Sequence, residues 1–199
     1  RSLFIYFNSQ SNYMQVLKFG GTSVANGENI NKVVQLVQAS LKKDRTILVV
    51  SALGGVTDML IQAGLSAAAG DESYKKKLHT IEQRHLETVK HLLPLTRQSS
   101  VLSLVKTKCN EIEDICNGVF LLNELSDRTR DKIVSYGELL SSIIIAARFE
   151  ALDIPNTWKD SRQLISTDSN FGYAAVDFPT TNQKIREFFD TAKGDLFIL

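Results

Sequence analysis

Hydrophobic positions change spacing along the first fifty residues, and each spacing predicts a type of local structure. Short apolar runs at residues 15–19 and 46–51 are typical of strands that are buried on both faces of a parallel sheet. Between them, apolar residues three and four positions apart predict a helix with one buried face. These residues are Ile30, Val33, Val34, Val37 and Leu41. The order is therefore strand, helix, strand.

From residue 57 to residue 152 the pattern is helical almost throughout. Because no strand interrupts the second part of this stretch, we expect a helical layer, at about residues 72–152, on one side of an α/β sheet. We predict the individual helices at residues 57–69, 72–93, 100–122 and 127–152, the last interrupted at Gly137.

The end of the chain returns to strands. We predict a strand at residues 157–159, a polar loop at 166–172, a helix at 181–193 and an apolar strand at 196–199. The whole pattern predicts an α/β fold with a mostly parallel central sheet. Because the chain stops inside an apolar run, we expect it to be a fragment of a longer protein.

Residues 1–13 precede the first methionine, Met14, and combine a short apolar run with a polar one. The apolar run is too short for a secretory signal, and no small-residue cleavage site follows it. We interpret residues 1–13 as an upstream extension, with an extra edge strand as the alternative. Residues 14–199 are then the folded unit.

The bulk composition excludes some classes of function. The 199 residues carry a formal net charge of +1, so no basic surface for nucleic acid is predicted, and no apolar run is long enough to span a membrane. Cys109 and Cys116 lie seven residues apart in a helical pattern, too far along one helix to form a disulfide. Buried free thiols favour a reducing, cytoplasmic location.

The first candidate site is the segment Lys18-Phe19-Gly20-Gly21-Thr22. Here a strand delivers a lysine, which can face an anion as a compact point charge. The two glycines then allow backbone N–H groups to approach a bound phosphate closely. This is not the P-loop motif, because the lysine precedes the glycines. The alternative is a strand end followed by an ordinary glycine turn.

The second candidate site is residues 51–58, with sequence Ser-Ala-Leu-Gly-Gly-Val-Thr-Asp, at the carboxyl end of the second strand. Ligands of open α/β sheets bind at this end of the strands. Its hydroxyls and amides could hold a small anion or a carboxylate at the start of the next helix. The alternative is an ordinary turn, with Thr57 or Asp58 as the helix cap.

Two further segments carry polar residues of interest. Glu138 follows Gly137 and precedes apolar residues, so it could receive a substrate ammonium, or it could be a carboxylate in the first turn of a helix. A polar loop contains Ser161, Arg162 and residues 166–172. Its polarity alone predicts only an ordinary turn. The three histidines are His79, His85 and His91, which lie six residues apart and cannot share one helix face. We therefore predict that their side chains are solvated and that they form no metal site.

Taken together, residues 18–24, 51–58, 135–142 and 162–172 resemble, in order and spacing, four motifs of the aspartokinase family, within the amino acid kinase superfamily. Segments 51–58 and 127–142 look closest to the bifunctional aspartokinase–homoserine dehydrogenases. The resemblance implies a three-layer amino-acid-kinase-like fold. It also implies transfer of the γ-phosphoryl group of ATP to the β-carboxylate of L-aspartate, an early step of lysine, threonine and methionine biosynthesis.

The resemblance also assigns roles by position. Lys18 would contact the ATP phosphates and stabilise charge during transfer, and Gly20, Gly21 and Thr22 would donate hydrogen bonds to the same phosphates. Mg²⁺ would bridge the phosphates, with no metal ligand assigned in this chain. The residues assigned to aspartate are Ser51, Thr57 and Glu138, with Glu138 on the ammonium group.

The resemblance finally implies that the chain is truncated after its N-terminal lobe, because later family elements, including a Gly-Arg-Gly-Gly-Ser-Asp loop and the adenine site, would lie beyond Leu199. We therefore expect the chain to be inactive alone and to self-associate as a homo-oligomer through exposed edges. Two alternatives stay open: another member of the amino acid kinase superfamily, and a non-catalytic module that binds aspartate.

Overall fold

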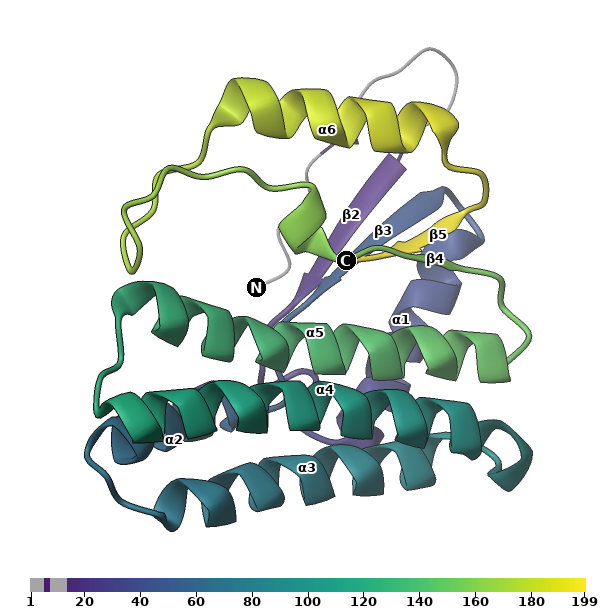
Figure 1. Cartoon of the computed structure of the whole chain (residues 1–199). Helices are drawn as coiled ribbons and strands as arrows, with labels where there is room; N and C mark the ends of the chain where they lie inside the picture. Colours follow the sequence, from purple (N-terminus) through teal and green to yellow (C-terminus); the bar gives the residue numbers. More distant parts are fainter. Residues whose placement is uncertain (1–5, 8–13) are drawn as a thin grey trace.

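The computed structural model describes residues 6–7 and 14–199, which contain a sheet with strand order β1-β2-β3-β5-β4 (Figure 1). Strands β2 to β5 are parallel, and β1 is antiparallel to β2. In the longest pair, Phe19 lies opposite Val50, so both strands end at the same edge. The strands are β1 (Tyr6–Phe7), β2 (Met14–Phe19), β3 (Arg45–Val50), β4 (Thr157–Trp158) and β5 (Leu196–Ile198).

The helices form one layer on each side of the sheet. Helix α6 lies on one side, and α1 to α5 lie on the other (Figure 1). Right-handed connections explain the division: the chain moves in one direction from β2 to β3 to β4, but moves back from β4 to β5, so α6 must cross on the opposite face. The helices are α1 (Gly27–Leu41), α2 (Val56–Ala68), α3 (Ser73–Leu92), α4 (Leu95–Leu122), α5 (Asp127–Ala151) and α6 (Phe178–Thr191).

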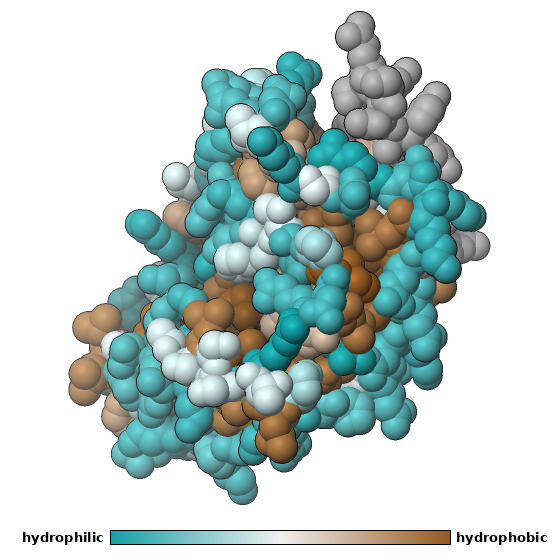
Figure 2. All heavy atoms as spheres, turned by 90° about the vertical axis from the view of Figure 1, so that its right-hand side faces the viewer, coloured by the Kyte–Doolittle hydropathy of each residue, from teal (hydrophilic) through white to brown (hydrophobic). Residues whose placement is uncertain are grey.

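The main core fills the space between the sheet and α1 to α5. Leu48 of β3 and Ile144 of α5 are fully buried there, as is Phe149 at the end of α5. Figure 2 views the side at which the strands begin, where apolar side chains gather between hydrophilic rims. On the other face of the sheet, Phe197 of β5 packs edge-on against Phe188 and Phe189 of α6.

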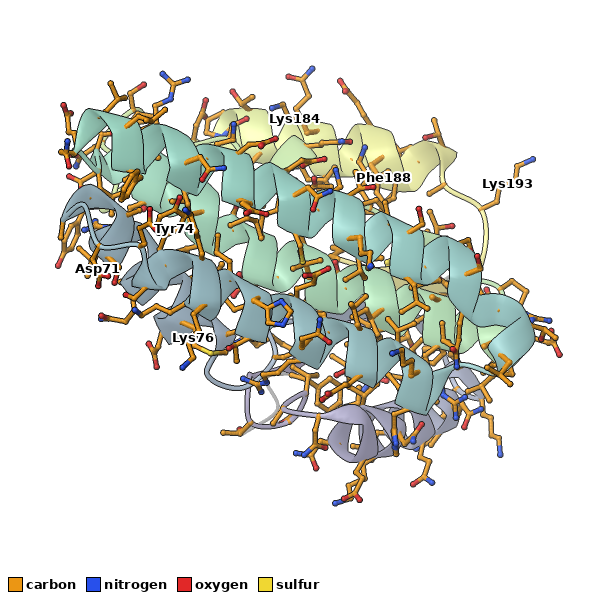
Figure 3. The ribbon with its side chains drawn as sticks, turned by 60° about the horizontal axis from the view of Figure 1, so that its bottom comes forward. Asp71, Tyr74, Lys76, Lys184, Phe188 and Lys193 are labelled. Carbon is orange, nitrogen blue, oxygen red and sulfur yellow. The ribbon has the colours of Figure 1, made fainter. Side chains whose placement is uncertain are left out.

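The expected helical layer at about residues 72–152 is present as α3, α4 and α5. Tyr74 lies between α3 and α4, where its hydroxyl donates to Asn117 Oδ1 at 2.5 Å (Figure 3). Lys76 points away from the layer (Figure 3) and, like Lys75, is exposed, whereas Lys77 is half-buried and donates to Ser66 Oγ at 3.1 Å. The layer is therefore apolar inside and polar outside, as the sequence predicts.

Two predicted helix features are wrong. Helix α4 begins at Leu95 rather than at residue 100. The sequence pattern misses its first turn because this turn is solvent-exposed and carries no apolar periodicity; Leu95 is 86% exposed. Helix α5 is continuous through Gly137. A Cβ at Gly137 would lie 2.8 Å from the Cβ of Ala52, so this glycine permits close packing instead of breaking the helix.

The prediction of solvated histidines is wrong for His85, which is fully buried on α3 while His79 and His91 are exposed. Its Nδ1 lies 2.7 Å from the carbonyl oxygen of Ile81, and its Nε2 is buried without a partner among the described residues. Burial lowers the pKa of His85 to about 4. The neutral ring is therefore part of the core of the helical layer.

The two cysteines are free thiols on α4, with Cys116 buried and Cys109 half-buried. Burial raises their pKa values, to about 12 for Cys109 and about 11 for Cys116.

Among the described residues, no helix is both long enough and apolar enough to cross a membrane. Tyr6–Phe7 does form the edge strand β1, which was the alternative for residues 1–13; the rest of that segment lies outside the described residues.

Candidate active site

The first glycine turn lies at the carboxyl end of β2. Alternation along the strand buries Leu17 and Phe19 and leaves Lys18 exposed on the opposite face of the sheet, at the same edge. The amide of Ser23 donates to Gly20 O at 2.9 Å and closes the turn. Thr22 is exposed, and its carbonyl oxygen accepts a hydrogen bond from Asn29 Nδ2 at 2.8 Å. The turn is therefore fixed by its backbone and by Asn29, and among the described residues the side chain of Thr22 forms no hydrogen bond.

The second glycine turn joins β3 to α2 beside the first. The amide of Ser51 donates to Phe19 O at 3.1 Å, which extends the pairing of the two strands into the turns. Gly55 has a φ of 77° and is the N-cap of α2, so neither Thr57 nor Asp58 caps this helix. The first amide of α2, that of Val56, donates to Leu53 O at 2.9 Å. No side chain caps the amides that follow it, so these can serve a ligand.

The two turns pack tightly against each other. A Cβ at Gly21 would lie 3.3 Å from the carbonyl oxygen of Ala52, and a Cβ at Gly54 would lie 3.0 Å from the Cβ of Ala25. From α3, Arg84 Nη2 donates to Gly54 O at 2.8 Å. A side chain at either position would force its neighbour to shift, so glycine favours the close approach, and a side chain from the helical layer holds the second turn in place.

Glu138 reaches the same edge from the middle of α5, and not from a first turn as one sequence reading had it. Its Oε1 accepts a hydrogen bond from the amide of Ala52 at 3.4 Å. One turn later, Ser141 Oγ donates to Ser51 O at 2.6 Å. The fold therefore brings Glu138 and Ser51 together, whereas Lys18 lies on the other face of the sheet and Thr57 is half-buried at the start of α2.

A pocket of about 200 Å³ opens beside Glu138 at the carboxyl ends of β3, β4 and β5. Its apolar floor includes Val49 and Val50, and its polar wall includes Asp160 and Arg162. The sequence pattern places Arg162 in a polar loop and in one of the four motifs, but assigns it no role, and it does not single out Asp160. Their position directly after the predicted strand at 157–159 is the signal that identifies them, because strand ends of a parallel sheet meet at one edge.

Asp160 and Arg162 form an ion pair in this wall, with Nη2 and Oδ2 2.7 Å apart. Partial burial alone would raise the pKa of Asp160, but the hydrogen bonds from Arg162 outweigh it and hold this pKa below its usual value. The hydrogen bond to Asp160 raises the pKa of Arg162. Both groups therefore stay charged near neutral pH, and with Glu138 they give the pocket two carboxylates and one guanidinium.

The polar loop at residues 166–172 lies away from this pocket and has a structural role. Asp168 Oδ1 accepts from the amides of Asn170 and Ala175, both at 3.1 Å, and so shapes a hairpin. The amide of Gly172 donates to Asp131 Oδ2 at 2.7 Å, which docks the hairpin on the start of α5. Within the described residues, no group of three or more His, Cys, Asp or Glu side chains could hold a metal ion.

Comparison with known proteins identifies relatives of this chain. Aspartokinase 1, chloroplastic, of Arabidopsis thaliana is 33% identical over 158 residues, covering 77% of this chain and 26% of the relative. A bifunctional aspartokinase/homoserine dehydrogenase 1, chloroplastic, of the same plant is 29% identical over 186 residues, covering 92% of this chain and 20% of the relative. The chain thus spans about a quarter or less of the length of these relatives.

The fold also matches solved structures. Aspartokinase III of E. coli in complex with lysine and aspartate has a TM-score of 0.78 at 24% identity, over 90% of this chain and 39% of that chain. The same enzyme with aspartate and ADP gives 0.79 at 22% identity, over the same shares. The model of the amino acid kinase family matches residues 14–199. With its three layers, its parallel sheet and this match over nearly its whole length, the chain belongs to the amino acid kinase family.

Proposed function

We propose that this chain forms the aspartate-binding and phosphate-binding part of an aspartate kinase. The observation that carries the proposal is the meeting of two glycine turns and Glu138 at one edge of the sheet, where Ala52 contacts both Gly21 and Glu138. Its relatives are aspartokinases and bifunctional aspartokinase/homoserine dehydrogenases, which makes L-aspartate the first substrate to test.

In the proposed reaction, a β-carboxylate oxygen of aspartate attacks the γ-phosphorus of ATP, an O–P bond forms, and the bond to ADP breaks. The attacking carboxylate is already ionised near neutral pH, so no protein base is required. Lys18 would stabilise the charge on the phosphates, and Gly20, Gly21 and Thr22 would donate to them. Glu138 would receive the ammonium group of aspartate, with Ser51 and Thr57 contacting the rest of that substrate.

Several finer points belong to the same proposal. Mg²⁺ would enter with the phosphates of ATP, and we assign no residue of this chain to it. Catalysis by the chain alone is not expected, since it spans a small share of its relatives. Four further points stay predictions: a homoserine dehydrogenase in the same protein, a role in lysine, threonine and methionine biosynthesis, assembly into a homo-oligomer, and a cytoplasmic location.

Calorimetry with L-aspartate and with Mg-ATP, beside an assay of aspartate-dependent ADP formation, tests the proposal. We expect binding of L-aspartate and weak binding of Mg-ATP through its phosphates alone. Aspartate binding should be lost in Glu138→Gln, and ATP binding in Lys18→Ala. Binding of N-acetylglutamate or carbamate in place of aspartate would favour another kinase of the family. Tight aspartate binding that is indifferent to ATP would favour a non-catalytic module, and ADP formation by this chain would contradict its expected inactivity.

A further inference from the structure

A continuous set of contacts links the wall of the pocket to the interior of the helical layer. The guanidinium of Arg162 donates from Nε and Nη2 to both carboxylate oxygens of Asp160, at 2.7 to 3.1 Å. Its Nη1 donates to Ser135 Oγ at 3.2 Å, and its Cζ lies 5.5 Å from the centre of the Tyr136 ring. Arg162 therefore joins the loop after β4 to one turn of α5.

Tyr136 in turn is anchored in the helical layer. It is only 5% exposed, and its hydroxyl donates to Glu111 Oε2 at 2.9 Å. The other oxygen of Glu111 accepts from Lys108 Nζ at 2.7 Å, so two residues of α4 complete the chain of contacts. Burial raises the pKa of Tyr136 to about 12, and the bond to Glu111 adds to this effect. The phenol therefore stays a hydrogen-bond donor at every physiological pH.

The position of these contacts indicates their purpose. Ser135 and Tyr136 directly precede Gly137 and Glu138, and Glu138 and Arg162 line the same pocket. The side chain of Arg162 is 43% exposed and that of Asp160 is 13% exposed, so the ion pair is only partly screened by solvent. What the contacts do fix is the distance between the two walls of the pocket.

We propose that Arg162 is a positioning residue: it holds the loop after β4 against the turn of α5 that carries Glu138, and so sets the width of the substrate pocket. The inference rests on the proposed function only for the identity of the ligand, L-aspartate. Asp160 keeps the guanidinium over the ring of Tyr136, because a bidentate pair fixes the orientation of both groups. Lysine cannot reproduce this geometry, since its ammonium is a point charge on a flexible stem.

The test compares Arg162→Met and Arg162→Lys with the control Arg97→Met. Arg97 forms an equally short pair with Asp153, at 2.8 Å, remote from the pocket. We expect Arg162→Met to weaken L-aspartate binding about tenfold and to speed amide exchange at residues 135–142 by about fivefold, with a smaller effect for Arg162→Lys. Arg97→Met should leave both quantities within about twofold of the wild type.

Two readouts keep the inference and the proposed function apart. If the wild-type chain does not bind L-aspartate, the proposed function fails, and amide exchange alone decides the inference. Exchange at residues 135–142 that is no faster in Arg162→Met than in Arg97→Met overturns it. Tyr136→Phe serves as a second variant, because it keeps the ring under Arg162 and removes only the bond to Glu111; we expect about threefold faster exchange.

Discussion

The helical layer and the carboxyl edge of the sheet are stabilised by different kinds of contact. In the layer, apolar side chains such as Ile144, Leu140 and Tyr74 are almost completely buried. At the edge, glycine turns, backbone hydrogen bonds and a few charged side chains fix the geometry, and Lys18 and Glu138 are exposed. Stability therefore resides mainly in the layer, and ligand chemistry in the edge. A small set of residues, including Arg84 and Tyr136, connects the two.

The largest effect should come from truncating a side chain inside the layer. Ile144→Ala removes a fully buried side chain and leaves a cavity, so we expect a loss of about 3 kcal/mol in the free energy of unfolding. Urea denaturation measures this loss. Leu121→Ala on α4 is the matched control, because Leu121 is 78% exposed and its truncation should cost less than about 0.5 kcal/mol. Equal losses in the two variants would contradict the contrast.

The buried His85 should make the layer sensitive to acid. Burial lowers its pKa in the folded state to about 4, whereas the unfolded chain has the ordinary value of 6.5. The unfolded state therefore binds more protons between these values, so stability is complete above the unfolded pKa and is lost as pH falls toward 4. From about pH 7 to about pH 5 we expect a loss of about 2 kcal/mol.

His85→Gln provides the comparison for this pH dependence. Glutamine is neutral at every pH, so the variant should lose much less stability over the same interval, whatever its stability at pH 7. Urea denaturation at both pH values is the measurement. An equal pH slope in the wild type and the variant would show that other groups cause the acid sensitivity.

A smaller loss in the free energy of unfolding is expected where the helical layer meets the carboxyl edge of the sheet. Arg84→Met removes the bond from α3 to Gly54 O, which should lower the free energy of unfolding by about 1 kcal/mol. ATP or aspartate binding should weaken as well, since the second glycine turn loses its support. Lys76→Met, on the outer face of the same helix, should change neither quantity (Figure 3). Unchanged ligand affinity in Arg84→Met would mean that the turn is fixed by its neighbours alone.

The smallest change in stability should come from Lys18, the residue that we propose contacts the phosphates of ATP. Lys18 is exposed, so Lys18→Ala should shift the free energy of unfolding by less than about 0.5 kcal/mol. ATP affinity should nevertheless fall about tenfold, because a point charge near the phosphates is lost. Thermal unfolding with and without Mg-ATP measures both effects. A large loss of stability without a change in affinity would assign Lys18 to the fold instead of the site.

Much of the fold could be predicted because the spacing of apolar residues differs between strands and helices and can be observed in the sequence. The strands at 15–19 and 46–51 follow from short apolar runs, and the helix between them follows from the spacing of residues such as Ile30 and Val37. The glycine turns were also predictable, since they follow strand ends. Where polar exposed positions left no period, as in the first turn of α4, the prediction was wrong by several residues.

Other features were decided only by the tertiary structure, because they depend on which distant segments meet. His85 is buried because α3 packs against α1, α2, α4 and α5, and the spacing of histidines along one helix contains no such information. Gly137 is a contact point because Ala52 lies against it. The sequence alone determined the elements and the residue types at the sheet edge. Packing decided which of them share a pocket, because burial and contact are properties of three dimensions.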